Sequence, residues 1–313
     1  MRQKANASNL LSKLSTGYDI LFEERNTRRV EHIIINCALI GFSVHLMLIL
    51  LAKHAVFPAS IVSQFNVSYL KAIYTPFSII LFYEVLTLIL ILPKSIVIFI
   101  GKQFEIITLI TIRSFFHDIA NYDLDKSEIY TLSFLKDIGI DLIGALLMFF
   151  FSAIFYRLFA RTKKSKSDAS LKRVEFINIK KSTALFLSFF LFILSIVSLV
   201  TWLNESYQAV ISGAHLPNPN TVFYKDFFSA MIFVDVFMLI LSFIYSSSYD
   251  IIFRNGGFVI STILVRIALT AEKPFNIYFA LTSVLFGVCL MSLFVFYSYK
   301  LGKEESEILQ GEN

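Results

Sequence analysis

Long apolar stretches alternate with short polar segments along most of the 313-residue chain. A helix of roughly 20 apolar residues crosses the hydrocarbon core of a membrane, so these stretches predict transmembrane helices. The eight helices are expected at residues 33–52, 74–98, 104–119, 138–159, 184–203, 227–253, 258–270 and 275–299. Pro93 is expected to kink the second of them, because proline removes a backbone hydrogen-bond donor. The predicted fold class is an all-α, polytopic integral membrane protein.

One pattern of charges occurs twice in these stretches. It consists of an apolar run with one acid, a polar turn, and a second apolar run with one arginine. The pattern reads Glu84, Gly101-Lys102-Gln103 and Arg113 in the first half, and Asp235, Arg254-Asn255-Gly256 and Arg266 in the second. It predicts two tandem repeats of four helices each, at residues 30–160 and 182–300. The other segments are a cytoplasmic arm at 1–29, a basic linker at 161–181 and a cytoplasmic tail at 301–313.

The distribution of basic residues predicts how the helices are oriented. The N-terminal arm and residues 157–181 both carry an excess of lysine and arginine, which is typical of cytoplasmic segments. An even number of crossings must then separate them, so residues 104–119 must span the membrane despite Lys102, Glu105 and Arg113. Both termini are therefore expected in the cytoplasm. The two repeats share one orientation, related by a pseudo-twofold axis along the membrane normal.

The N-terminal arm carries apolar residues at helical spacing between Leu10 and Phe22, with basic residues nearby. Two arrangements are open for this helix. It lies on the membrane surface, or it packs beneath its own bundle.

The composition supports a membrane location and excludes other classes. Hydrophobic residues make up 56% of the chain, and the mean hydropathy is +0.70. Residues 1–29 lack the continuous apolar core of a signal peptide, and no transit sequence is apparent, so we expect a bacterial cytoplasmic (inner) membrane. The chain contains no phosphate-binding loop, nucleophile elbow or metal-ligand motif. We therefore expect no enzyme activity, no cofactor and no metal.

Charged residues inside the apolar stretches are candidates for function. An ionised side chain at the centre of a bilayer costs several kcal/mol, so it pairs with another charge or lines a polar cavity. Glu84 is predicted to pair with Arg113, and Asp235 with Arg266. The acid and the arginine differ in their distance from the predicted turn, and this difference is larger for the second pair. Such pairs either hold helices together or line a path for an ion, a proton or a small anion.

Two further residues are accessory candidates. His45 lies near the middle of the first predicted helix, where a histidine either packs or relays protons. Asp141 lies near the outer end of the fourth predicted helix, and either Asp141 or Asp137 is expected to compete with Glu84 for Arg113.

The basic linker is the candidate for contacts at the membrane surface. Its charges are expected to contact anionic lipid headgroups or a partner, and they are Lys163, Lys164, Lys166, Lys172 and Arg173. These residues lack interleaved aromatic side chains, so no nucleic-acid partner is expected.

Two stretches resemble a known family of membrane proteins. Phe104-Glu105 followed by ITLITIRSFF, and VISTILVRIALTAEKPFNIYFALTSVLFG from Val259, are similar to the phosphate-starvation-inducible PsiE-type proteins. Those proteins carry an FE-type run, a basic residue, an aromatic residue and a proline turn into the next helix; the first half of this chain lacks the proline turn. The resemblance covers the last two helices of each half. It implies a four-helix inner-membrane unit, here duplicated, and no mechanism or site residues.

The leading functional hypothesis is transport or conduction of a small ion or solute between the two repeats. Glu84, Arg113, Asp235 and Arg266 would line or gate the path. The alternative is a scaffold or sensor subunit that binds a partner or lipid through its basic linker and arm. A polar cavity between the repeats favours transport, and a tightly packed centre with every charge paired favours the scaffold. An apolar flank on one face would indicate a homo-oligomer or a membrane partner.

Overall fold

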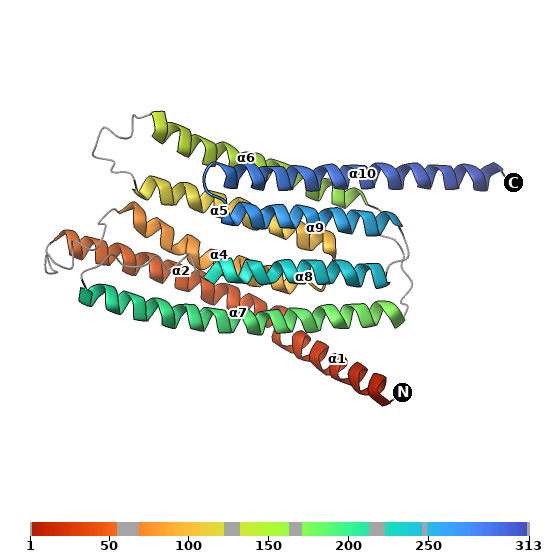
Figure 1. The fold of residues 1–313 in the computed structure, drawn as a ribbon, viewed down its shortest axis with the longest axis horizontal. Coiled ribbons are helices and arrows are strands. Elements are labelled where there is room, and N and C mark those ends of the chain that lie inside the picture. Colours follow the sequence, from red (N-terminus) through yellow and green to blue (C-terminus); the bar gives the residue numbers. More distant parts are fainter. Residues whose placement is uncertain are drawn as a thin grey trace.

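The computed structural model of the chain describes residues 2–54, 69–121, 132–162, 171–212, 223–245 and 249–311. These residues are almost entirely helical, and no strand occurs among them (Figure 1). The helices are α1 (Arg2–Leu21), α2 (Glu24–Lys53), α4 (Leu70–Ile91), α5 (Ile96–Asn121), α6 (Leu132–Arg161), α7 (Leu171–Ser212), α8 (Phe223–Tyr245), α9 (Tyr249–Thr270) and α10 (Phe275–Gly311). The predicted all-α fold is confirmed for this part of the chain.

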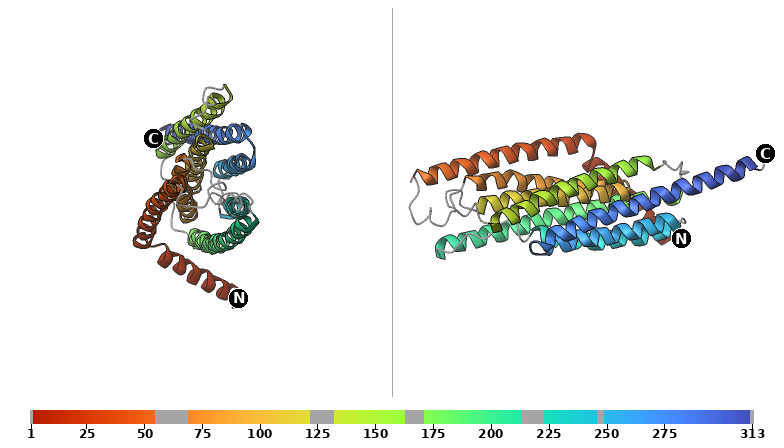
Figure 2. Two further views of the ribbon diagram at one scale, coloured as in Figure 1. Left: turned by 90° about the vertical axis from the view of Figure 1, so that its left-hand side faces the viewer. Right: turned by 90° about the horizontal axis from the view of Figure 1, so that it is seen from above.

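Helices α2 to α10 form one elongated bundle (Figures 1 and 2). Successive helices run in opposite directions, so both chain termini, the end of α6 and the start of α7 lie at one end of the bundle. We call this the terminal end. Neighbours along the chain pack together in the orders α2–α4–α5–α6 and α7–α8–α9–α10. The two rows meet where α6 contacts α10, α5 contacts α9, and α4 contacts α7.

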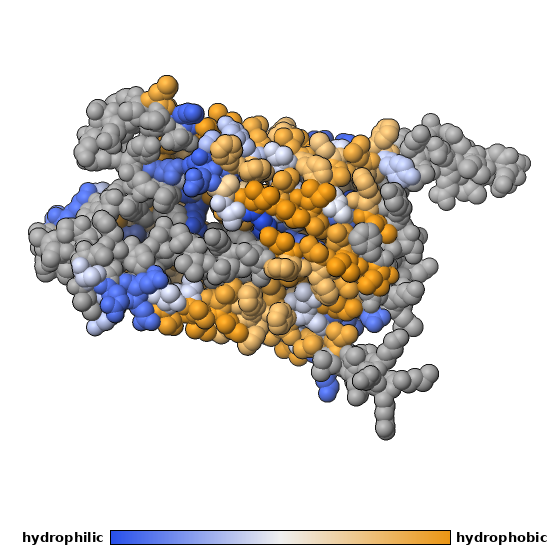
Figure 3. Space-filling view, in the orientation of Figure 1, coloured by the Kyte–Doolittle hydropathy of each residue, from blue (hydrophilic) through white to orange (hydrophobic). Residues whose placement is uncertain are grey.

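The outside of the bundle is strongly apolar. Figure 3 shows hydrophobic residues covering the middle of the visible face. Large side chains that are more than half exposed include Leu39, Met47, Phe149, Phe186, Phe189, Phe233 and Phe296. Five helical segments among the described residues are long and apolar enough to cross a membrane, namely Glu24–Lys53, Ile138–Arg161, Val174–Glu205, Ile251–Thr270 and Phe275–Tyr297. These properties are compatible with an integral membrane protein.

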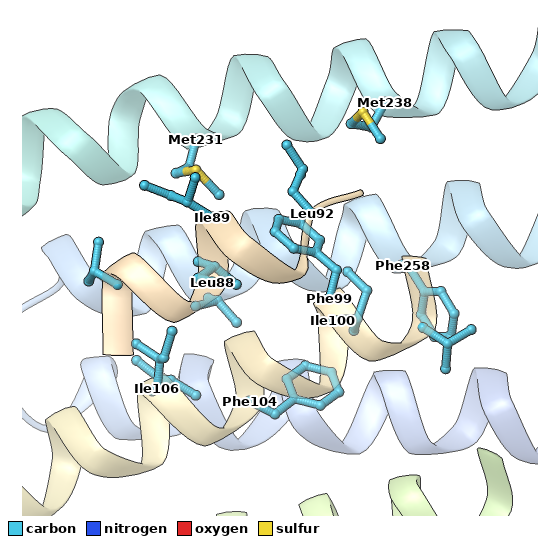
Figure 4. Close-up of a cluster of buried hydrophobic side chains, with 14 of the residues drawn as sticks. Leu88, Ile89, Leu92, Phe99, Ile100, Phe104, Ile106, Met231, Met238 and Phe258 are labelled. Carbon is cyan, nitrogen blue, oxygen red and sulfur yellow. The ribbon is translucent and has the colours of Figure 1, made fainter. Parts of the chain in front are cut away.

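The apolar core lies where α4, α5, α8 and α9 meet (Figure 4). Leu88 and Phe104 are completely buried there, as are Met231 of α8 and Phe258 of α9. In a membrane the surroundings are as apolar as these side chains, so close van der Waals packing drives helix association more than removal from water does. A dense core of interlocking large side chains supplies that packing.

The hairpins turn earlier in the chain than the sequence pattern predicts. α4 ends at Ile91 and α5 begins at Ile96, so residues 101–103 lie inside α5 and Pro93 lies in the turn instead of kinking a helix. In the second half α9 begins at Tyr249, so residues 254–256 also lie inside a helix and not in a turn. The prediction was wrong because the polar residues were taken as a break in the apolar run, whereas here the helices continue through them and bury Gln103 and Asn255.

The N-terminal helix α1 packs against the bundle. Its last turns contact α7, and Tyr18 is buried there. The Tyr18 hydroxyl donates to the Leu90 carbonyl oxygen of α4 at 2.8 Å, and Lys181 Nζ of α7 lies 2.7 Å from Asp19 Oδ2. Of the two arrangements open for this helix, packing on the bundle is therefore the one that the structure adopts for the end of α1.

Candidate functional site

A polar network is buried among apolar side chains where α5, α8 and α9 meet. Its members are Gln103, Asp235 and Arg266, which are 1%, 4% and 5% exposed. Arg266 Nη2 donates to Gln103 Oε1 at 3.3 Å, and Gln103 Nε2 donates to Asp235 Oδ1 at 3.4 Å. Arg266 Nη2 also lies 3.8 Å from Asp235 Oδ2. The structure thus brings together the predicted partners Asp235 and Arg266, with Gln103 bridging them.

Gln103 is a site residue that the sequence pattern did not reveal. The pattern predicted a turn at this residue, whereas Gln103 lies about two turns inside α5, opposite α9. An amide inside an otherwise apolar helix needs a polar partner, because an unsatisfied polar group in hydrocarbon costs several kcal/mol. A glutamine inside an apolar stretch is therefore a signal in the sequence that could have identified Gln103 as a site residue.

A small cavity adjoins the network. Its volume is about 20 Å³, and its polar lining residues are Asp235, Asn255 and Thr262. Thr262 is a polar neighbour of the Asp235 carboxylate, and no described group lies at ordinary hydrogen-bond distance from Asp235 Oδ2. A cavity needs about 10 to 15 Å³ to hold one water molecule, so this cavity is large enough for a single water, but most of its wall is apolar.

A second cluster places Lys102 of α5 between two glutamates. The Lys102 ammonium contacts Glu84 of α4 and lies 2.9 Å from Glu105 Oε2. Tyr156 of α6 packs directly over Gly101, where a Cβ atom would lie only 2.7 Å from the tyrosine hydroxyl. The absence of a side chain at Gly101 therefore lets α6 approach α5 beside this cluster.

This arrangement replaces the predicted pair of Glu84 with Arg113. That prediction measured depth from a turn at residues 101–103, but the hairpin turns at residues 92–95. Measured from the observed turn, Glu84 and Lys102 lie at similar depths in the hairpin. Arg113 is half-buried about 11 residues farther along α5, which is roughly 16 Å at the rise of a helix. An arginine side chain does not span that distance.

A third cluster lies at the end of the bundle opposite the terminal end. Lys273, between α9 and α10, contacts Asp118 of α5 and lies 2.5 Å from Asp141 Oδ2 of α6. Burial by itself would lower the pKa of Lys273, but the hydrogen bonds and charges of the two aspartates raise it above its ordinary value. Asp141 is completely buried. It therefore pairs with Lys273 and not with Arg113 as predicted, and Lys273 was missed because it lies in a short charged turn.

The remaining predicted residues have separate positions. His45 Nδ1 of α2 lies 2.6 Å from Thr75 Oγ1 of α4, so the imidazole has a hydrogen-bond partner between two packed helices. Among the linker residues, Lys172 and Arg173 lie in the first turn of α7. Lys163, Lys164 and Lys166 lie outside the described residues.

These clusters hold groups that bind protons or pair with small cations, and they do not resemble a metal centre. Within the described ranges, no three histidine, cysteine, aspartate or glutamate side chains gather as metal ligands. At the Asp235 site, a water-sized cavity adjoins a buried carboxylate.

Comparisons with protein-family models, with curated proteins and with solved structures found no match. The resemblance to PsiE-type proteins therefore stays a prediction. What the chain itself establishes is an all-α architecture whose apolar helices are compatible with an integral membrane protein.

Proposed function

We propose that this protein conducts protons across a bacterial cytoplasmic membrane, through the centre of an eight-span bundle made of two tandem four-helix repeats. Both termini would be cytoplasmic. The observation that supports this most directly is the Asp235 carboxylate, which is 4% exposed and lies beside a water-sized cavity. An ionisable residue inside a membrane is costly, and such residues commonly mark ion or proton paths.

Each member of the buried network has a role in this proposal. Asp235 accepts the proton on Oδ2, the oxygen that no described group approaches to ordinary hydrogen-bond distance, and releases it to the next carrier. Gln103 holds the carboxylate by donating to Oδ1. The positive charge of Arg266 stabilises the carboxylate after the proton leaves, because opposite charges attract strongly away from bulk water.

Polar groups lead away from Asp235 toward both ends of the bundle. Asn255 lines the same cavity and lies closer to the terminal end. Toward the other end, the buried Arg266 is followed by Lys273 with its two aspartates. Water molecules between such groups would complete a proton path.

The size of the cavity favours a proton over a larger cargo. With room for about one water molecule, the site does not hold an organic solute or a hydrated metal ion. A proton needs only a chain of hydrogen-bonded groups.

Proton flux into liposomes tests this function. The purified protein is reconstituted around a pH-sensitive dye, and potassium with valinomycin sets the membrane voltage. The wild type should acidify the lumen faster than protein-free liposomes do, and Asp235→Asn should reduce the rate to the protein-free value. Glu272→Gln is the control, because it removes an exposed acid between α9 and α10. Equal flux in wild type and Asp235→Asn would contradict the proposal.

A scaffold without flux is the second candidate, and the dense packing of the centre favours it. Leu88 and Phe104 are completely buried in that centre, and Glu84 and Asp235 both have cationic neighbours. If no variant conducts protons and Asp235→Asn only lowers thermal stability, the buried charges serve packing, and the scaffold becomes the better account.

A further inference from the structure

An apolar groove that contains one guanidinium lies between α9 and α10. Its volume is about 370 Å³, which is within the range of pockets that bind small organic ligands. Arg254 is the charged residue of the groove. The other lining residues are aromatic or aliphatic, namely Phe253, Leu290, Leu293, Phe294, Phe296 and Tyr297.

The groove lies where a membrane surface would meet the bundle. Arg254 lies near the start of the apolar segment Ile251–Thr270, and Tyr297 is the last residue of the apolar segment Phe275–Tyr297. Arginine and tyrosine at the ends of spans typically lie at the level of lipid headgroups. Leu293 and Phe253 are 63% and 61% exposed, so the groove opens toward the surface that faces acyl chains.

The guanidinium is held at this place by its neighbours. Arg254 lies over the Phe294 ring, with 4.4 Å between the guanidinium carbon and the ring centroid. Its Nη2 also lies 3.2 Å from Asn255 Oδ1. These contacts hold the guanidinium between Phe294 of α10 and Asn255 of α9, and the planar fork of a guanidinium matches the oxygens of a phosphate.

We infer that this groove binds an anionic phospholipid, with the phosphate on Arg254 and an acyl chain along the apolar walls. The charge decides the occupant: a guanidinium at the rim complements an anionic headgroup, and six apolar or aromatic lining residues complement a hydrocarbon chain. Lipid binding in this groove does not depend on proton conduction.

Native mass spectrometry of the detergent-solubilised protein tests this site. The protein is offered equal amounts of phosphatidylglycerol and phosphatidylcholine with the same acyl chains. The wild type should retain more phosphatidylglycerol. Arg254→Gln should weaken its retention about tenfold, whereas Arg254→Lys should preserve most of the preference. Leu293→Trp, which fills the groove without changing the charge, should weaken retention of both lipids.

Arg157→Gln is the matched control, because Arg157 is an exposed arginine near the terminal end of α6, outside the groove. It removes the same charge and should leave the preference for phosphatidylglycerol unchanged. Equal losses in Arg254→Gln and Arg157→Gln would mean general attraction between a cationic protein and an anionic lipid, and would overturn the inference. Unchanged retention in Arg254→Gln or in Leu293→Trp would overturn it too.

Discussion

At the scale of single residues, the buried pair of Asp235 and Arg266 makes a sharp prediction about stability. Both side chains are almost completely buried, so removing one charge leaves the other without its partner. Arg266→Gln should therefore lower the free energy of unfolding by about 3 to 5 kcal/mol. Denaturant titration in detergent micelles measures this change.

The double variant Asp235→Asn with Arg266→Gln is the control for that prediction. It removes both charges and keeps hydrogen-bonding amides next to Gln103, so it should be more stable than Arg266→Gln alone. If the costs of the two single substitutions simply add, the two residues are not energetically coupled.

Tyr18 predicts a pH dependence for the docking of α1. Burial, with a smaller effect of Asp19, raises the pKa of this phenol from about 10 to about 12. A group whose pKa is higher in the folded state stabilises that state below its unfolded pKa, and the contribution is lost as the pH rises toward the folded pKa. At pH 8, Tyr18→Phe should cost about 1 kcal/mol through loss of the hydrogen bond to Leu90.

The stability difference between wild type and Tyr18→Phe should shrink between about pH 10 and pH 12, because only the wild type releases this proton on unfolding. Thermal unfolding of both proteins at several pH values measures the difference. A difference that stays constant across this interval would show that Tyr18 does not ionise more readily when the chain unfolds.

At the scale of helices, glycines mark the closest contacts, and Gly287 predicts a large effect of a single methyl group. A Cβ atom at Gly287 of α10 would lie 2.4 Å from the ring of Phe104 of α5, which is completely buried. Gly287→Ala should therefore destabilise the protein by about 1 to 3 kcal/mol through overpacking. Gly256→Ala is the matched control: it lies inside α9 with open space around its Cβ position, so alanine there should be neutral or stabilise the helix. The free energy of unfolding of each variant is measured in detergent micelles. Equal changes in the two variants would contradict the close contact between Gly287 and Phe104.

The positions of the helix ends show what the sequence can and cannot predict. Apolar length predicted α2, α6, α7 and α10 near their observed places, because each is one long run. The ends of α4 and α5 were misplaced because Lys102 and Gln103 look like a turn until their partners Glu84 and Asp235 are known. Those partners lie on other helices, and no local pattern reveals them. Pro93 carried the better local signal for the turn, since proline ends a helix more often than it kinks one.

At the scale of the whole molecule, the number of membrane crossings decides the orientation of every segment. Five helical segments satisfy a strict requirement for apolar length. Among the described residues, the apolar stretches of α4 and α8 are too short, at Thr75–Ile91 and Met231–Leu241, and α5 carries Lys102, Glu105 and Arg113. In the bundle α4 and α5 lie in the interior, where an ion pair between them replaces contact with lipid, whereas α8 exposes Phe233, Ile240 and Ile244 on its outer face. We therefore predict that all eight of the helices from α2 to α10 cross the membrane.

Labelling of single cysteines distinguishes eight crossings from five. Cys37 and Cys289 are first replaced by serine, and one cysteine is then placed at Ser12, Lys94 or Glu272, which are all exposed. With eight crossings and a cytoplasmic N-terminus, a membrane-impermeant maleimide added to intact cells should label only Glu272→Cys. The other two sites should react after the membrane is opened.

Five crossings would reverse the result at two of the three positions. Without α4, α5 and α8, Lys94 would lie outside after one crossing and Glu272 inside after four, while Ser12 would stay inside. Labelling of Lys94→Cys in intact cells would therefore contradict the eight-span arrangement. It would also remove the basis for proton conduction, because the Asp235 network depends on α5, α8 and α9 lying side by side within the membrane.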